Sequence, residues 1–202
     1  MIKTIVFDMG NVLVHFRWRE LYHEMGLYGE RFDRMAAATV YDPVWNEIDR
    51  GGISDDEMLA AFIKNAPELE EEMKDLMYNR FSGYLKKFDY TDAWIDAAVS
   101  AGYRTYILSN FSRKAFEVSA KELDYVSKVD GAVISYRIGM IKPEPEIYRY
   151  LIDTYDVIPE EAVFIDDNED NIEAAKQFGF NTVLFCDKAS ADEELSRMGV
   201  VL

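Results

Sequence analysis

The chain has 202 residues, of which 38 are acidic and 22 are basic, so its formal net charge is −16. Because 49% of the residues are hydrophobic, the chain can bury a core, which excludes the disordered class. The excess of acidic residues disfavours a nucleic-acid partner. A single cysteine, Cys186, excludes an internal disulfide framework and a cysteine-based zinc site. Cys186 ends an apolar run, so we expect a buried, unreactive thiol.

No stretch approaches the roughly 20 apolar residues that span a bilayer. The apolar run at the N-terminus is too short for a signal peptide. We therefore expect a soluble globular protein of the cytoplasm with no membrane partner.

Five short apolar runs are typical of buried parallel strands; they cover residues 2–7, 105–108, 132–134, 162–165 and 182–185. Helical patterns separate the last four, with Ser112 as a predicted N-cap and Pro145 as a predicted first residue of a helix. Alternation of strands and helices predicts an α/β fold with a doubly wound, Rossmann-like parallel sheet.

Residues 15–88 break this alternation. Ser54 to Glu57 form a capping-box pattern, and a second amphipathic stripe runs from Leu69 to Met77, but no strand pattern is found. We therefore predict two parts: an α/β core of residues 1–14 and 89–202, and a helical cap of residues 15–88 inserted after the first strand.

Four polar motifs follow the predicted strands. In a doubly wound sheet, ligands bind beyond the carboxyl ends of the strands, so motifs far apart in sequence should converge there. The motifs are Asp8-Met9-Gly10-Asn11-Val12, Ser109-Asn110, Lys142-Pro143 and Asp166-Asp167-Asn168 leading to Asn171.

The chemistry of these motifs is complementary. Asp8 and Asp167 can hold a hard divalent cation such as Mg²⁺, which prefers oxygen ligands. Ser109 and the backbone N–H of Asn110 can donate hydrogen bonds to phosphoryl oxygens, and Lys142 supplies positive charge. A carboxylate that attacks phosphorus forms an aspartyl-phosphate and divides one difficult displacement into two easier ones. The residues therefore indicate phosphoryl-transfer chemistry.

The same motifs, in this order, resemble those of the haloacid dehalogenase-like (HAD) phosphatases. The resemblance rests on Phe7 to Val12, Leu108-Ser109-Asn110, Lys142-Pro143 and Phe164 to Ala175, and it covers essentially the whole chain. Within that superfamily the chain is most similar to small helical-cap phosphatases, a subgroup that includes glucose-1-phosphatase-like enzymes, through residues 45–54.

The resemblance implies a Mg²⁺ site. Asp8 would be both the nucleophile and a metal ligand, and the other ligands would be the backbone carbonyl of Gly10 and the side chain of Asp167. Asp166 and Asn171 would support these ligands or contact the metal through water.

The resemblance also assigns the phosphoryl-binding residues. Ser109, Asn110 and Lys142 would bind the phosphoryl group, and Lys142 would share in catalysis with the nucleophile.

Gly10 departs from the common family pattern, which has a second aspartate at this position as general acid and base. Such help is typically worth about 10²–10⁴-fold in rate, so we expect slow turnover or a substitute. The substitute could be a water molecule or a cap residue such as Glu47 or Asp49. The glucose-1-phosphatase-like subgroup has the same Gly-Asn pair, which argues against loss of all activity.

The leading hypothesis is a magnesium-dependent phosphomonoester hydrolase for a small phosphorylated metabolite, with a sugar phosphate as one candidate. One alternative is a metal-independent 2-haloacid dehalogenase, which needs no second aspartate. The other is a phosphate-binding regulatory domain with weakened catalysis. The sequence leaves the substrate open, and it does not decide between a monomer and a dimer.

Overall fold

The computed structural model describes residues 1–202 and contains a five-stranded parallel sheet in the order β5-β4-β1-β6-β7. The strands are β1 Thr4–Phe7, β4 Arg104–Ser109, β5 Gly131–Ile134, β6 Ala162–Asp166 and β7 Asn181–Leu184. Each matches a run predicted from the sequence to within two residues at either end, and the α/β fold class is confirmed.

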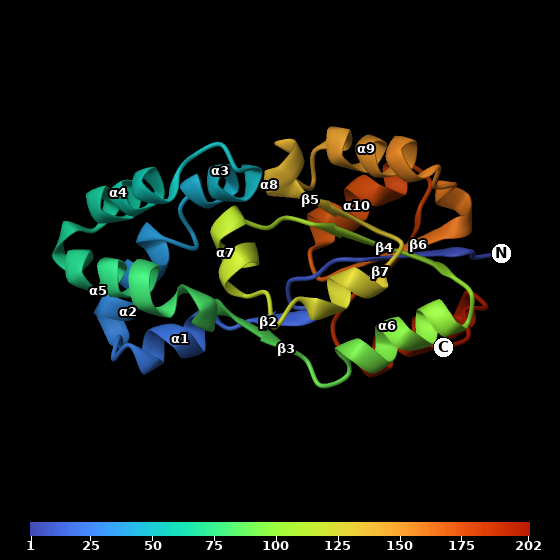
Figure 1. The fold of residues 1–202 in the computed structure, drawn as a ribbon, viewed down its shortest axis with the longest axis horizontal. Helices are drawn as coiled ribbons and strands as arrows, with labels where there is room; N and C mark the ends of the chain where they lie inside the picture. Colours follow the sequence, from blue (N-terminus) through green and yellow to red (C-terminus); the bar gives the residue numbers. More distant parts are fainter.

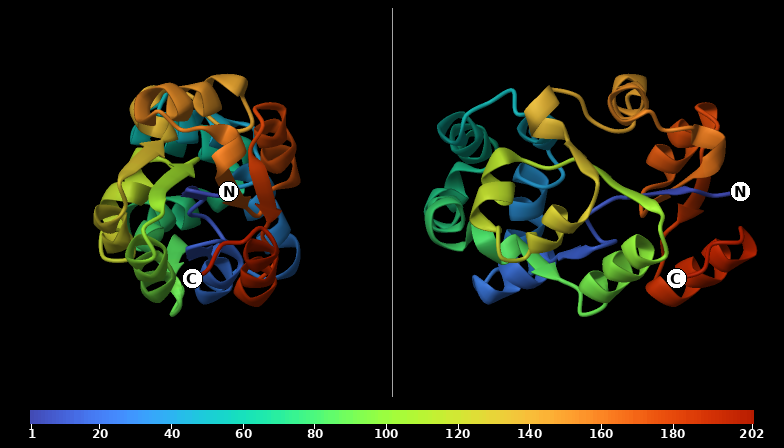
Figure 2. Two further views of the ribbon diagram at one scale, coloured as in Figure 1. Left: turned by 90° about the vertical axis from the view of Figure 1, so that its right-hand side faces the viewer. Right: turned by 45° about the vertical axis from the view of Figure 1, so that its right-hand side comes forward.

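Helices cover both faces of this sheet (Figures 1 and 2). Along β1, Ile5 and Phe7 belong to the core shared with α6 and α11, whereas Val6 belongs to the core shared with α9 and α10. Successive side chains of a strand point to opposite faces, so a continuously apolar run supplies both cores. These helices are α6 Thr91–Ser100, α9 Pro145–Tyr155, α10 Glu169–Gln177 and α11 Lys188–Arg197.

Two shorter helices complete this part of the chain, α7 Arg113–Val118 and α8 Ser135–Ile138. The predicted Ser112 cap is confirmed, because its side chain accepts a hydrogen bond from the backbone N–H of Ala115. Pro145 is the first residue of α9, as predicted, where its missing N–H costs no hydrogen bond.

The segment between β1 and α6 is mostly helical and lies at one end of the sheet (Figure 1). The capping box is present, with both the Ser54 and the Glu57 side chains bonded to backbone N–H groups. The helices are α1 Trp18–Glu24, α2 Gly29–Ala38, α3 Val44–Arg50, α4 Asp55–Asn65 and α5 Glu70–Asp75, with a π-helical turn at Leu76–Arg80.

The prediction of no strands in residues 15–88 was wrong. Strands β2 (Val14–Phe16) and β3 (Leu85–Lys87) pair antiparallel where the chain leaves and re-enters the α/β part. With three residues each, they are too short to show alternation in the sequence. We propose that this two-stranded ribbon is the connection between the α/β core (1–14 and 89–202) and the helical insertion (15–88).

Helix α3 of the helical insertion contacts the α/β part at α8 and at Glu144, the residue before α9. The Ser135 hydroxyl donates a 2.5 Å hydrogen bond to the Asp49 carbonyl. The Arg50 guanidinium makes two hydrogen bonds to the Glu144 carboxylate, at 2.8 and 2.6 Å. Gly51 ends α3 with φ +77° and approaches Tyr136 so closely that a Cβ there would lie 2.7 Å from its carbonyl oxygen. These contacts fix the position of α3 against the end of the sheet.

Replacing Gly51 with alanine should loosen this contact and destabilise the protein. A left-handed backbone costs a non-glycine residue about 1–2 kcal/mol, and overpacking adds about 1–3 kcal/mol. Gly102→Ala is the matched control, because Gly102 has φ +84° but no atom within 4 Å of the point where a Cβ would lie. Urea unfolding should show a larger loss of unfolding free energy for Gly51→Ala than for Gly102→Ala. Equal losses would mean that α8 shifts away from the new Cβ at no cost in stability.

Cys186 was predicted to be buried, but the structure places it at the surface. Strand β7 ends at Leu184, so Cys186 lies in the loop before α11 and not in the strand. None of the helices is both long and apolar enough to cross a membrane.

Candidate active site

The four predicted motifs meet at the carboxyl ends of neighbouring strands. Asp8 directly follows β1, Ser109 ends β4 and Asp166 ends β6. Because β1 pairs with β4 on one side and with β6 on the other, these three residues lie at adjacent strand ends. The loop before α9 adds Lys142 to the same place, through ion pairs described next.

Lys142 is the centre of a buried charge cluster. Its side chain is 1% exposed, and Nζ lies 2.8 Å from Asp8 Oδ1 and 2.6 Å from Asp166 Oδ2. Asn110 holds the backbone of Lys142 in place, accepting from its N–H at 2.7 Å and donating to its carbonyl at 2.9 Å. The Asn110 side chain therefore positions Lys142. The backbone N–H of Asn110 stays available for the phosphoryl-binding role predicted from the sequence.

Asp166 is fully buried, and hydrogen-bond donors occupy both of its oxygens. Lys142 Nζ and the Asn168 N–H each donate to one oxygen, at 2.6 and 2.8 Å, and Asn171 Nδ2 lies 3.1 Å from both. The Tyr148 hydroxyl in turn donates to the Asn171 carbonyl at 2.9 Å. A carboxylate satisfied in this way orients its neighbours, which fits the supporting role predicted for Asp166 and Asn171.

The residues at this site fit a hard divalent cation. Carboxylate oxygens of Asp8, Asp166 and Asp167 all lie within 4.8 Å of one another. The Lys142 ammonium pairs with Asp8 and Asp166, and no second cationic side chain pairs with these two carboxylates or with Asp167, so the cluster has excess negative charge that a cation can offset. Since hydrogen-bond donors occupy the oxygens of Asp166, the groups that could hold Mg²⁺ are Asp8, Asp167 and the Gly10 carbonyl.

Burial strongly affects the nucleophile candidate. It raises the pKa of Asp8 to about 7, against the opposing effect of Lys142, and the nearby Asp166 adds to the increase. A cation bound to the same carboxylate would favour its charged form.

Asn11 has a role that the sequence did not reveal. Its side chain donates to Asp167 Oδ2 at 2.9 Å and accepts from the Phe16 N–H at 3.2 Å. Its φ of 55° is left-handed, a conformation that asparagine tolerates better than most residues. Asn11 therefore orients Asp167 from the turn after β1; the only signal in the sequence was an asparagine in that turn.

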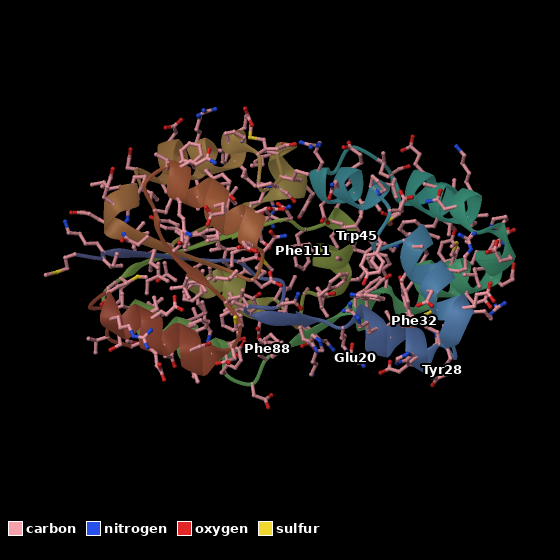
Figure 3. All side chains as sticks on the ribbon, turned by 180° about the vertical axis from the view of Figure 1, so that it is seen from behind. Glu20, Tyr28, Phe32, Trp45, Phe88 and Phe111 are labelled. Carbon is pink, nitrogen blue, oxygen red and sulfur yellow. The ribbon has the colours of Figure 1, made fainter.

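A cavity of about 160 Å³ opens above Asp8, Gly10 and Asp167. Aromatic side chains form much of its wall, including Trp45 of α3 and Phe111 after β4, which Figure 3 shows between the helical insertion and the sheet. The other lining residues are Asn11, Phe16, Asp49, Phe81, Tyr84, Leu85, Asn110, Ser112 and Ala115.

The remaining predicted residues do not line this cavity. Lys142, Asp166 and Asn171 are buried, and so is Ser109. The Ser109 hydroxyl has no hydrogen-bond partner within the protein, which leaves it available as a donor.

The two acidic residues of α3 named as substitutes for the missing aspartate differ in position. Asp49 lines the cavity together with Asp8 and Gly10. Glu47 does not; it is exposed, and its carboxylate lies 3.5 Å from the Arg50 guanidinium. The structure therefore separates two candidates that the sequence could not distinguish.

Comparison with known proteins identifies the family. Residues 2–179 match the sequence model of a hydrolase family described as haloacid dehalogenase-like hydrolase. The chain belongs to the haloacid dehalogenase-like hydrolases. This confirms the superfamily that the motifs indicated, and with it an enzyme of the hydrolase class.

Two curated relatives match most of the chain. D-ribitol-5-phosphate phosphatase of Bacteroides thetaiotaomicron is 31% identical, over 90% of this chain and 91% of that protein. Drimenol cyclase drtB of Aspergillus calidoustus is 27% identical over 98% of this chain, which spans only 37% of that longer protein.

A solved structure of the same family shares the fold. It is a HAD family enzyme of Bacteroides thetaiotaomicron in complex with magnesium and inorganic phosphate, 22% identical, with a TM-score of 0.71 over 91% of this chain and 93% of that one.

Proposed function

We propose that this protein is a magnesium-dependent phosphomonoester hydrolase that works through an aspartyl-phosphate on Asp8. The observation that carries the proposal is the buried Lys142 ammonium, held 2.8 Å from Asp8 and 2.6 Å from Asp166 beside the Asp167 carboxylate. This arrangement supports the proposal, because the Asp8 carboxylate lies next to a positive charge and next to carboxylate oxygens that could bind a metal. The 31% identical relative, a phosphatase by name, supports the same chemistry.

In the first step, an oxygen of Asp8 attacks phosphorus and the bond to the leaving alcohol breaks. The transferring phosphoryl group is stabilised by Lys142, the Ser109 hydroxyl and the Asn110 N–H. The Asn110 side chain also fixes the position of Lys142 through two hydrogen bonds to its backbone. Asp8, Asp167 and the Gly10 carbonyl would hold Mg²⁺, which supplies positive charge that offsets the charge on that group. In the second step, water attacks the aspartyl-phosphate and releases inorganic phosphate.

The cavity wall favours a substrate with an apolar or planar alcohol part. Phe16, Phe81 and Phe111 offer no hydrogen bonds, and the Tyr84 hydroxyl is already 2.9 Å from that of Tyr22. No lysine or arginine lines the cavity, so a second phosphate or a carboxylate on the substrate would find no counter-ion. We infer that an aryl or apolar alkyl phosphate fits this wall better than the sugar phosphate suggested by the sequence resemblance.

A turnover screen with and without Mg²⁺ tests this function. We expect phosphate release only with Mg²⁺, and its loss on chelation, because three carboxylates would face one ammonium without the metal. Aryl and apolar alkyl phosphates should have higher kcat/KM than hexose phosphates and ribitol 5-phosphate. The reverse order would support a polyol phosphate, the substrate class named for the 31% identical relative.

Two other results of the same screen would replace the proposal. Chloride release from 2-chloropropionate without metal would indicate the dehalogenase alternative. Magnesium-dependent binding of phosphorylated compounds without turnover would indicate the regulatory domain.

A further inference from the structure

The proposed hydrolysis needs a proton donor that the α/β part does not supply at the usual position. The leaving alcohol requires a proton in the first step, and the attacking water must lose one in the second. Gly10 has no side chain with which to exchange either proton. Of the residues lining the cavity, the acidic ones are Asp8, Asp49 and Asp167, and two of these are already assigned as nucleophile and metal ligand.

Asp49 enters the cavity from the opposite side, on α3 of the helical insertion. Its backbone carbonyl accepts the 2.5 Å hydrogen bond from Ser135, and the next residue, Arg50, is paired with Glu144. Gly51 follows against Tyr136. The last two residues of α3 and the glycine that follows it are thus attached to the α/β part, so the Asp49 side chain has a fixed place over the strand ends. Such preorganisation is what acid–base catalysis requires.

The surroundings of Asp49 suit a group that both gives and takes a proton. Its pKa is raised to about 7, chiefly by burial and also by the negative charge of Asp8, while the positive charge of Lys142 opposes the increase. A carboxyl group in this range is available in both protonation states near neutral pH. Glu47, the other acidic side chain of α3, is exposed and has no such environment.

We propose that Asp49 is the general acid and base of this enzyme and replaces the aspartate that the family usually has at position 10. This proposal rests on the proposed function. In the first step Asp8 forms a bond to phosphorus, the bond from phosphorus to the leaving oxygen breaks, and the Asp49 proton passes to that oxygen. In the second step the Asp49 carboxylate takes a proton from water as its oxygen bonds to phosphorus. The bond from phosphorus to Asp8 breaks, which restores both carboxyl groups to their starting states.

The space at Gly10 allows a rescue experiment. A Cβ placed on Gly10 would meet no atom within 4 Å, and its backbone is not in the left-handed region. An aspartate can therefore be introduced at the family's usual position for the general acid and base.

The test uses Asp49→Asn with p-nitrophenyl phosphate, whose leaving group departs as an anion and needs no proton. We expect a burst of about one p-nitrophenolate per active site, followed by turnover slowed by about 10²–10⁴-fold, because only the second step still needs a base. On an alkyl phosphate the same variant should show no burst, since its leaving group needs the missing acid. Glu47→Gln is the matched control and should keep the wild-type rate.

The double variant Gly10→Asp/Asp49→Asn should regain most of the lost turnover and lose the burst. If Asp49 had only a structural role, Asp49→Asn would show no burst, and an aspartate at residue 10 would not restore its turnover. Wild-type turnover by Asp49→Asn, or a folded but slow Asp49→Asn protein without a burst, would overturn the assignment.

Failure of the proposed function gives a different result. Acid quenching of the wild-type enzyme during turnover, followed by mass spectrometry, should find phosphate on Asp8. If turnover occurs without phosphate on Asp8, the aspartyl-phosphate route is wrong, whatever the Asp49 variants do. If Asp8 is phosphorylated and Asp49→Asn hydrolyses it at the normal rate, only the assignment of Asp49 is wrong.

Discussion

Asp8→Asn is expected to abolish phosphate release, with a loss on the order of 10⁶-fold, as when the nucleophile is removed from a covalent mechanism. The amide keeps the size of the side chain but cannot form the acyl phosphate. Mass spectrometry should find no phosphate on residue 8, and steady-state assays with p-nitrophenyl phosphate should show no turnover above background. Full activity of this variant would refute the assignment of the nucleophile.

Asp8→Asn should also stabilise the metal-free protein. A higher stability of this variant would show that its loss of activity is not caused by unfolding. The pKa of Asp8 is raised in the folded state to about 7, mainly by burial. Folded-state stability therefore falls as the pH rises from the ordinary carboxyl pKa toward 7, and the full cost of ionising Asp8 is present above that pH. Asparagine removes this cost, whereas exposed Asp153→Asn in α9 does not and is the control. Urea unfolding in EDTA at pH 8 should show a higher midpoint for Asp8→Asn alone.

The α/β part of the molecule was predictable because its signals are local. Each buried strand is a short apolar run, and the runs of β1, β4 and β6 end at the polar residue of a motif, as at Phe7-Asp8 and Ile165-Asp166. Parallel pairing then brings those ends together without further information. The positions of Asp8, Ser109 and Asp166 therefore followed from strand order alone, whereas Lys142 comes from the loop before α9 and is held by Asn110.

The helical insertion was less predictable because its contacts are not local. Asp49 and Glu47 are two residues apart, and only the attachment of α3 to Ser135 and Glu144 determines which of them reaches the cavity. The aromatic wall likewise combines Phe16, Trp45 and Phe111, from three separate segments. Sequence periodicity describes one helix at a time, so it cannot show which face meets another part of the chain.

Lys142→Met is expected to destabilise the protein by about 3–5 kcal/mol, because removing one partner of a buried ion pair leaves uncompensated charge. Asp8 and Asp166 both pair with this ammonium, and the lysine side chain is 1% exposed. Turnover should also fall, by about 10²–10³-fold, the usual effect of removing one group that stabilises developing charge.

Urea unfolding measures the loss of stability in Lys142→Met, and phosphate-release assays measure the loss of turnover. Saturating Mg²⁺ should raise the unfolding midpoint of the folded variant, since a cation bound by Asp8 and Asp167 offsets part of the missing charge.

The double variant Lys142→Met/Asp166→Asn separates the two effects. With Asp166 neutral, the buried charge left by the missing lysine is reduced to that of Asp8, and Asn171 can still hydrogen-bond to the new side chain. Most of the lost stability should therefore return, because neutral groups often replace a buried ion pair at little cost. Turnover should not return, since no positive side chain then faces the phosphoryl group. If activity recovered together with stability, Lys142 would serve only to neutralise buried carboxylates, and the phosphoryl-binding role assigned to it would be wrong.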